Sequence, residues 1–134
     1  MKCMLDTNIC IYLIKKKPSV VIGRLKKKKL SEVCISSITL SELEYGVEKS
    51  ERIDQNKIAL AEFILPIEVM SYDELAATQY GKVRAYLEKK GQTLGALDML
   101  IAAHALSASL ALVTNNVREF ARVPGLKIEN WTKP

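Results

Sequence analysis

Short apolar runs alternate along this chain with longer segments whose apolar residues recur at helical spacing. The runs at 2–5, 33–36, 67–70 and 110–114 predict buried strands, and 127–129 predicts a last edge strand. The segments between them predict helices from the end of the first strand to about residue 16, over about 18–30, after Ser36 or Ser37, and over about 53–64, 73–90 and 98–107. The pattern therefore alternates strand and helix along its length.

Alternation of this kind is typical of the α/β class. We predict a single domain, 1–134, in which a central parallel sheet of four to five short strands lies between layers of helices. Such a sheet collects ligands beyond the carboxyl ends of its strands. Polar residues directly after a predicted strand are therefore the first place to look for chemistry.

Composition and cysteine use limit where the protein works. No apolar run approaches the roughly 18 residues that a membrane-spanning helix needs, and Asp6 and Asn8 interrupt the apolar start of the chain. A signal peptide is not expected, so we place the protein in the cytoplasm, without membrane contact. Cys3, Cys10 and Cys34 match no zinc spacing and lie in apolar stretches, which predicts small buried hydrophobic residues.

Positive charge is concentrated near the start of the chain. Residues 1–30 hold nine Lys or Arg and one acid, a balance of +8, whereas residues 31–134 hold eleven basic and fourteen acidic residues, a balance of −3. The excess lies in 15–17 and 26–29, which predicts either contacts to phosphates or a solvated helix surface. The candidate phosphate-binding residues are Lys15, Lys26, Lys27, Lys28, Lys29 and, further along, Arg118.

Four polar residues follow or flank the ends of predicted strands. Asp6 ends the first strand, Glu42 lies on the helix after the second, Asp98 opens the last long helix, and Asn116 follows the strand after it. Asp6 and Asp98 are also well placed to cap helices, and Asn116 suits a turn. Glu42 has no such alternative role, and Gly46 one turn later leaves space above its carboxylate.

Three carboxylates at one end of a sheet repel one another and raise each other's pKa. Mg²⁺ or Mn²⁺ relieves that cost, because hard divalent ions take carboxylate oxygens and keep waters for substrate phosphates. An ion so held lowers the pKa of a bound water and stabilises a leaving oxygen. No Cys/His cluster offers a zinc site, and we expect the lone His104 to be a packed core residue. The acids therefore indicate metal-assisted attack on phosphorus.

The residues around these positions resemble a known family. Four motifs are similar, in order and spacing, to VapC toxins, which are PIN-domain ribonucleases: MLDTN at 4–8, SELEYG at 41–46, DMLIAAHA at 98–105 and TNNVREF at 114–120. The segment RVPGL at 122–126 and the closing Asn130-Trp131 also resemble this family. Each motif is short, but together they extend the resemblance over essentially the whole chain.

The resemblance implies a PIN-like three-layer sandwich and Mg²⁺- or Mn²⁺-dependent endoribonuclease activity. Asp6, Glu42 and Asp98 match the family's metal-binding acids, and Asn116 matches its fourth catalytic position, which is Asp in many relatives. Because Asn116 carries no charge, Glu119 is an alternative source of a fourth carboxylate. The TNN…REF ending is similar to toxins that cut tRNA anticodon stem-loops, so tRNA is the expected substrate, and the basic residues named above are its expected RNA contacts.

The same resemblance implies partners. A VapC toxin of a type II toxin–antitoxin pair is held silent by a cognate VapB-type antitoxin, whose tail lies across the active groove, and it meets DNA only through that antitoxin. A homodimer and a toxin–antitoxin hetero-oligomer are expected. On this chain we expect an apolar anchor of the tail to contact helix residues near Ile9, Leu13 and Leu43, while a basic side chain reaches the acids.

Two other functions fit parts of this pattern. A haloacid-dehalogenase-like phosphatase also places an Asp after its first strand, but its chemistry needs a second Asp two residues later, where this chain has Asn8. A catalytically silent PIN-like module that binds RNA or protein would keep the fold without the chemistry. The retained acids argue against such a module, and a metal titration separates it from an enzyme.

Overall fold

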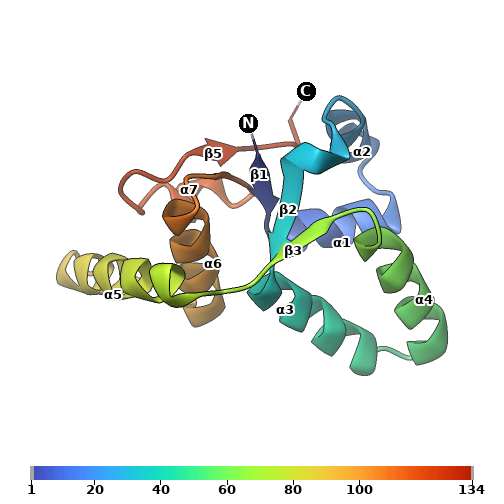
Figure 1. Cartoon of the computed structure of the whole chain (residues 1–134), viewed down its shortest axis with the longest axis horizontal. Coiled ribbons are helices and arrows are strands. Elements are labelled where there is room, and N and C mark those ends of the chain that lie inside the picture. The colour runs from blue at the N-terminus through green and yellow to red at the C-terminus, as the bar shows by residue number, and fades with distance from the viewer. Residues whose placement is uncertain (1, 134) are drawn as a thin grey trace.

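A parallel sheet of five strands forms the centre of the protein, which was analysed as a computed structural model that describes residues 2–133 (Figure 1). The strand order is β3-β2-β1-β4-β5. The strands are β1 (Cys3–Leu5), β2 (Val33–Ser36), β3 (Glu68–Met70), β4 (Ala111–Val113) and β5 (Ile128–Glu129). Every residue of β1, β2 and β4 is buried, which explains why these strands are uninterrupted apolar runs in the sequence.

Helices cover both faces of this sheet, so the predicted α/β sandwich is confirmed (Figure 1). One layer contains α1 (Thr7–Lys15), α2 (Ser19–Lys26), α3 (Ser37–Glu48) and α4 (Ile53–Ile64). The other contains α5 (Glu74–Lys89), α6 (Ala96–Ser107) and the short α7 (Val117–Phe120). Within β1, Cys3 and Leu5 face the first layer and Met4 faces the second, as the alternation of side chains along a strand requires.

Two helix boundaries differ from the sequence prediction, and one short helix was not predicted. Helix α2 ends at Lys26 rather than near residue 30, and a 3₁₀ turn at Leu30–Glu32 leads into β2. Helix α6 begins at Ala96, so Asp98 lies within its first turn instead of opening it. Helix α7 was not predicted, because a single turn of helix leaves no periodic signal in a sequence.

The buried polar and sulfur groups fit the core. Cys3, Cys10 and Cys34 are all buried and unpaired, as expected. His104 is also buried, and its Nδ1 lies 2.8 Å from the hydroxyl of Ser36, the N-cap residue of α3. Burial lowers the pKa of this imidazole, so it is neutral and links α6 to the start of α3. Within residues 2–133, no helix is long and apolar enough to cross a bilayer.

Candidate active site

The sheet brings distant parts of the sequence to one edge. Leu5 of β1 is in register with Ile35 of β2 and with Val113 of β4. The residues after these positions therefore leave the sheet side by side at its carboxyl edge, Asp6 after β1 and Thr114 after β4. The polar positions identified in the sequence lie on the segments that begin there.

Asp6 caps α1 and is also part of an electrostatic cluster. Its Oδ1 accepts a hydrogen bond from the backbone N–H of Ile9 at 2.9 Å, so the predicted capping role is real. Only 5% of the residue is exposed. Burial raises the pKa of Asp6 to about 6, and the charges of Asp98 and Glu42 raise it further, against hydrogen bonds from Thr114 and Ile9 that lower it. Capping alone does not explain an acid here, because a neutral Asn caps a helix equally well.

Asp98 lies half-buried in the first turn of α6. The N-cap position of α6 belongs to Gly95, so Asp98 is not the capping residue that its place in the sequence allowed. Burial raises the pKa of the Asp98 carboxyl, and the charges of Glu42 and Glu119 raise it further. The electrostatic environment of Asp98 therefore includes acids from two other helices.

Glu42 projects from the middle of α3 and is held by a hydrogen bond across the site. The hydroxyl of Thr7, at the start of α1, donates to its Oε1 at 2.5 Å. Apart from its chain neighbours and the backbone of α3 itself, no atom lies within 4 Å of the place where a Cβ on Gly46 would stand, so the predicted space beside Glu42 is present. Glu42 is thus oriented by Thr7, while one side of it stays open.

Two residues, Asn116 and Glu119, are candidates for the fourth catalytic residue. The backbone N–H of Asn116 donates to the Thr114 hydroxyl at 2.9 Å, and Asn116 holds the N-cap position of α7 without a capping hydrogen bond from its side chain. This geometry is that of a turn residue, and a catalytic role for Asn116 stays a prediction. Glu119, by contrast, acts on the pKa of Asp98 from within α7. Four carboxylates, Asp6, Glu42, Asp98 and Glu119, therefore share one electrostatic environment.

This donor set fits a hard divalent cation. Among residues 2–133, no group of three or more His, Cys, Asp or Glu side chains is close enough together to hold a metal ion. Mg²⁺ does not require such a group, because it keeps several waters and takes one or two carboxylates directly. Burial raises the pKa values of Asp6 and Asp98, and the neighbouring acids raise them further. A bound cation offsets both effects, because it favours the charged form of each carboxylate.

The basic residues divide into two groups. Lys15 lies at the end of α1 beside the acid-bearing helix α3, and Arg118 is exposed on α7 next to Glu119. The run Lys26–Lys29 instead connects α2 to the start of β2, and so lies toward the amino edge of the sheet. In that run, Lys28 Nζ lies 3.8 Å from a carboxylate oxygen of Glu129. The predicted RNA contacts are therefore not one continuous surface with the acids.

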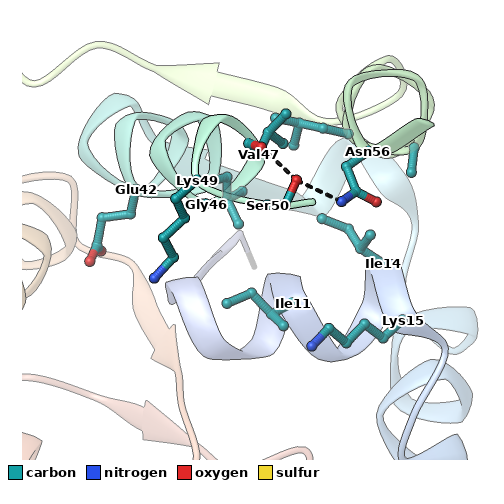
Figure 2. A pocket seen from close by; sticks show the side chains of 12 residues that line it. Ile11, Ile14, Lys15, Glu42, Gly46, Val47, Lys49, Ser50 and Asn56 are labelled. Carbon is teal, nitrogen blue, oxygen red and sulfur yellow. Dashed lines mark hydrogen bonds between the residues drawn. The ribbon is translucent and has the colours of Figure 1, made fainter. Parts of the chain in front are cut away.

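A cavity of about 360 Å³ lies beside Glu42, between α1, α3 and α4 (Figure 2). Leu43 lines it, as predicted for the groove, whereas Ile9 and Leu13 are not among its lining residues. Ile11 and Ile14 of α1 line it instead. Figure 2 shows the side chains of Glu42 and Lys49, which both line the cavity, extending in the same direction from α3. The cavity thus combines a largely apolar lining with one acid of the site, Glu42.

Comparison with known proteins gives matches over nearly the whole chain. The model of the PIN domain family matches residues 3–126. The chain is 48% identical over 132 residues to the tRNA(fMet)-specific endonuclease VapC of Shigella flexneri, covering 98% of this chain and 99% of that protein. The solved structure of DNA-bound VapBC from Salmonella typhimurium contains a chain that is 49% identical, with a TM-score of 0.92 and 98% of both chains covered. VapBC2 from Rickettsia felis, bound to a promoter DNA fragment, gives 42% identity and a TM-score of 0.92 over 98% of this chain and 99% of that one.

Proposed function

This chain belongs to the PIN domain family and, within it, to the VapC ribonucleases, and we propose that it is the toxin of a type II toxin–antitoxin pair. Its activity is the Mg²⁺- or Mn²⁺-dependent cleavage of RNA phosphodiester bonds. Asp6, Glu42 and Asp98 hold the cation, and Glu119 provides a fourth carboxylate. The observation that carries this proposal is the gathering of these acids at one edge of the sheet, where burial and then the charges of Asp98 and Glu42 raise the pKa of Asp6 to about 6.

The acids of the site are oriented before any substrate binds. The Asp6 carboxylate accepts hydrogen bonds from the Ile9 backbone N–H and from the Thr114 side chain. Thr7 fixes Glu42 through its hydroxyl. A divalent ion, when bound, supplies a water of lowered pKa and stabilises the leaving oxygen. These side chains thus hold the carboxylate oxygens that would bind the cation, and the cation would in turn bind a substrate phosphate.

A transfer RNA is the proposed substrate. Support comes from two relatives named as tRNA(fMet)-specific endonucleases, which are 48% and 49% identical to this chain over almost its full length. The TNNVREF motif at 114–120 is similar to that of toxins that cut tRNA anticodon stem-loops. This similarity supports the anticodon stem-loop as the cleaved region. Unpaired loops suit such an enzyme, because their bases are free to be contacted on their faces and edges.

An antitoxin is the proposed protein partner. The neighbouring solved structures are complexes of VapB and VapC proteins, some of them bound to DNA. We assign the cavity between α1, α3 and α4 to the apolar anchor of an antitoxin tail, with a basic side chain of the tail placed near Glu42. DNA is contacted through the antitoxin, the toxin is a homodimer within the larger complex, and the complex acts in the cytoplasm.

The proposal is tested by cleavage of an initiator tRNA transcript by the purified protein. Cleavage is expected with Mg²⁺ or Mn²⁺, and Glu42→Gln or Asp98→Asn is expected to remove most of it while the circular dichroism spectrum stays unchanged. Glu44→Gln is the matched control, because Glu44 lies on the same helix but is exposed. A Glu42→Gln protein as active as the Glu44→Gln protein would reject the acid site and favour a catalytically silent module.

A further inference from the structure

A stripe of three side chains leads away from the acids along α3. Tyr45 follows Glu42 by three residues and Lys49 follows Tyr45 by four, spacings that place them on one face of a helix. The amine of Lys49 lies over the Tyr45 ring, 5.1 Å from its centroid. Glu42 and Lys49 extend in the same direction from α3 (Figure 2). The stripe of Glu42, Tyr45 and Lys49 therefore runs from an acid of the cleavage site to the positively charged Lys49 amine.

Tyr45 is unusual for its exposure. Its relative exposure is 66%, higher than that of any other aromatic residue among the exposed large hydrophobic side chains of residues 2–133. It is not part of the lining of the cavity between α1, α3 and α4, which Lys49 and Glu42 do line. An aromatic ring has two faces, and only one of them can lie beneath the Lys49 amine. The packing of the domain thus gives no reason for an aromatic residue at this position.

Lys49 likewise forms no ion pair that would stabilise the described part of the fold. In the described part of the chain, no carboxylate lies within ion-pair distance of its amine, whereas the neighbouring Glu48 is 3.5 Å from Lys57. Proteins bind single-stranded nucleic acids with this combination of an exposed aromatic ring and a neighbouring cation. Bases stack on the aromatic face, and the backbone phosphates pair with lysine.

We propose that Tyr45 stacks against an unpaired base of the RNA next to the scissile phosphate and that Lys49 contacts the phosphate of that nucleotide. This inference rests on the ribonuclease function proposed above and specifies how its substrate is positioned. The base on Tyr45 fixes the strand relative to Glu42, one helical turn away. The site therefore prefers a loop nucleotide over a base-paired one, because a paired base already stacks within its own helix.

The chain contains a matched control for this pair. Tyr86 and Lys90, at the end of α5, repeat the spacing of Tyr45 and Lys49, with Lys90 5.8 Å from the ring centroid and Tyr86 42% exposed. None of the four acids lies on α5. Substitutions at Tyr86 and Lys90 therefore remove the same kind of exposed ring and charge without touching the stripe on α3.

The experiment measures kcat and KM for Mg²⁺-dependent cleavage of an initiator tRNA transcript. Tyr45→Ala and Tyr45→Leu are expected to raise KM by about five- to a hundredfold, with kcat changed less than about threefold, because stacking contributes to binding. Tyr45→Trp restores KM, since it keeps an aromatic face. Lys49→Gln raises KM and makes the dependence of log affinity on log salt shallower by about 0.7. Tyr86→Ala and Lys90→Gln match the wild-type protein.

Each result separates this inference from the ribonuclease function. A wild-type protein that cleaves the transcript and Tyr45 variants with unchanged KM would overturn the stacking role and leave the enzyme intact. Equal effects at Tyr45 and Tyr86 would overturn it as well, since they would reflect exposed aromatics in general. If Tyr45 variants cleave normally but escape inhibition by the antitoxin, the stacking role is overturned, and the stripe contacts the antitoxin instead of RNA. A wild-type protein that fails to cleave RNA with Mg²⁺ would overturn both proposals.

Discussion

Replacing Asp6 with an asparagine is expected to stabilise the metal-free protein near neutral pH. The amide keeps the shape of the side chain and an oxygen for the Ile9 backbone N–H, which lies 2.9 Å from Oδ1. It removes the negative charge that burial, Asp98 and Glu42 all oppose. The fold thus loses a repulsive group and retains its helix cap.

The size of the effect follows from the pKa of Asp6, which is raised from 3.8 to about 6. A pKa difference of about two corresponds to about 3 kcal/mol, and solvation of the new amide reduces the gain, so we expect about 1–3 kcal/mol, or roughly 3–10 °C in Tm. Between about pH 4 and pH 6 the folded protein holds a proton that the unfolded chain has released, so the wild-type free energy of unfolding falls as pH rises through that window. The Asp6→Asn substitution removes this contribution, and the two proteins converge below about pH 4.

Urea denaturation in EDTA, at a series of pH values, measures both quantities. Asp73→Asn is the control, because the Asp73 Oδ1 caps α5 in the same way, accepting from the Ala76 backbone N–H at 3.0 Å. We expect the free energy of unfolding of that variant to stay within about 0.5 kcal/mol of wild type, since both residues cap well. An Asp6→Asn protein that is less stable than wild type by the same amount at every pH would refute the reasoning and assign Asp6 to the helix cap alone.

Three further predictions concern the fourth position, the lysines and the partner. Asn116→Asp is expected to keep cleavage and tighten Mg²⁺ binding, whereas Asn116→Ala costs about ten- to a hundredfold in rate if the amide orients a ligand; an unchanged rate would leave Asn116 a turn residue. Neutralising Lys26–Lys29 is expected to weaken the binding of all RNAs alike, without changing the rate at which bound RNA is cleaved. The slope of log affinity against log salt concentration becomes shallower by about 0.7 per lost phosphate contact. An unchanged slope would mean that the run only solvates the surface. A peptide of the antitoxin tail is expected to abolish Mg²⁺-stimulated cleavage, and full activity with the tail bound would reject occlusion of the site.

The sequence predicted the sheet and its helices well, because each central strand is short and buried on both faces. It predicted the edge at which Asp6, Glu42 and Asp98 meet for a related reason, since parallel strands end together. It did not distinguish which residues of α1 line the cavity beside α3. Every residue from Ile9 to Ile14 is Ile, Cys, Tyr or Leu, so periodicity could not separate the core-facing Ile9 from the cavity-facing Ile11.

Other features needed the tertiary structure. Gly95 gave no capping signal for the start of α6, which hid the true place of Asp98 within its first turn. The influence of Glu119 on Asp98 depends on how the short α7 returns to the site, and no local pattern encodes that path. The separation of Lys26–Lys29 from the acids was expected from the sequence, and the structure adds that the run connects α2 to the start of β2.

We propose that a divalent cation held by Asp6, Glu42 and Asp98 makes this protein a ribonuclease. The most direct test of this proposal is the rate of cleavage of an initiator tRNA transcript as the Mg²⁺ concentration is raised from zero in protein first treated with EDTA. We expect no cleavage in chelator and a rate that rises to saturation and recovers fully when Mg²⁺ is returned. Cleavage that continues at an unchanged rate in EDTA would contradict it.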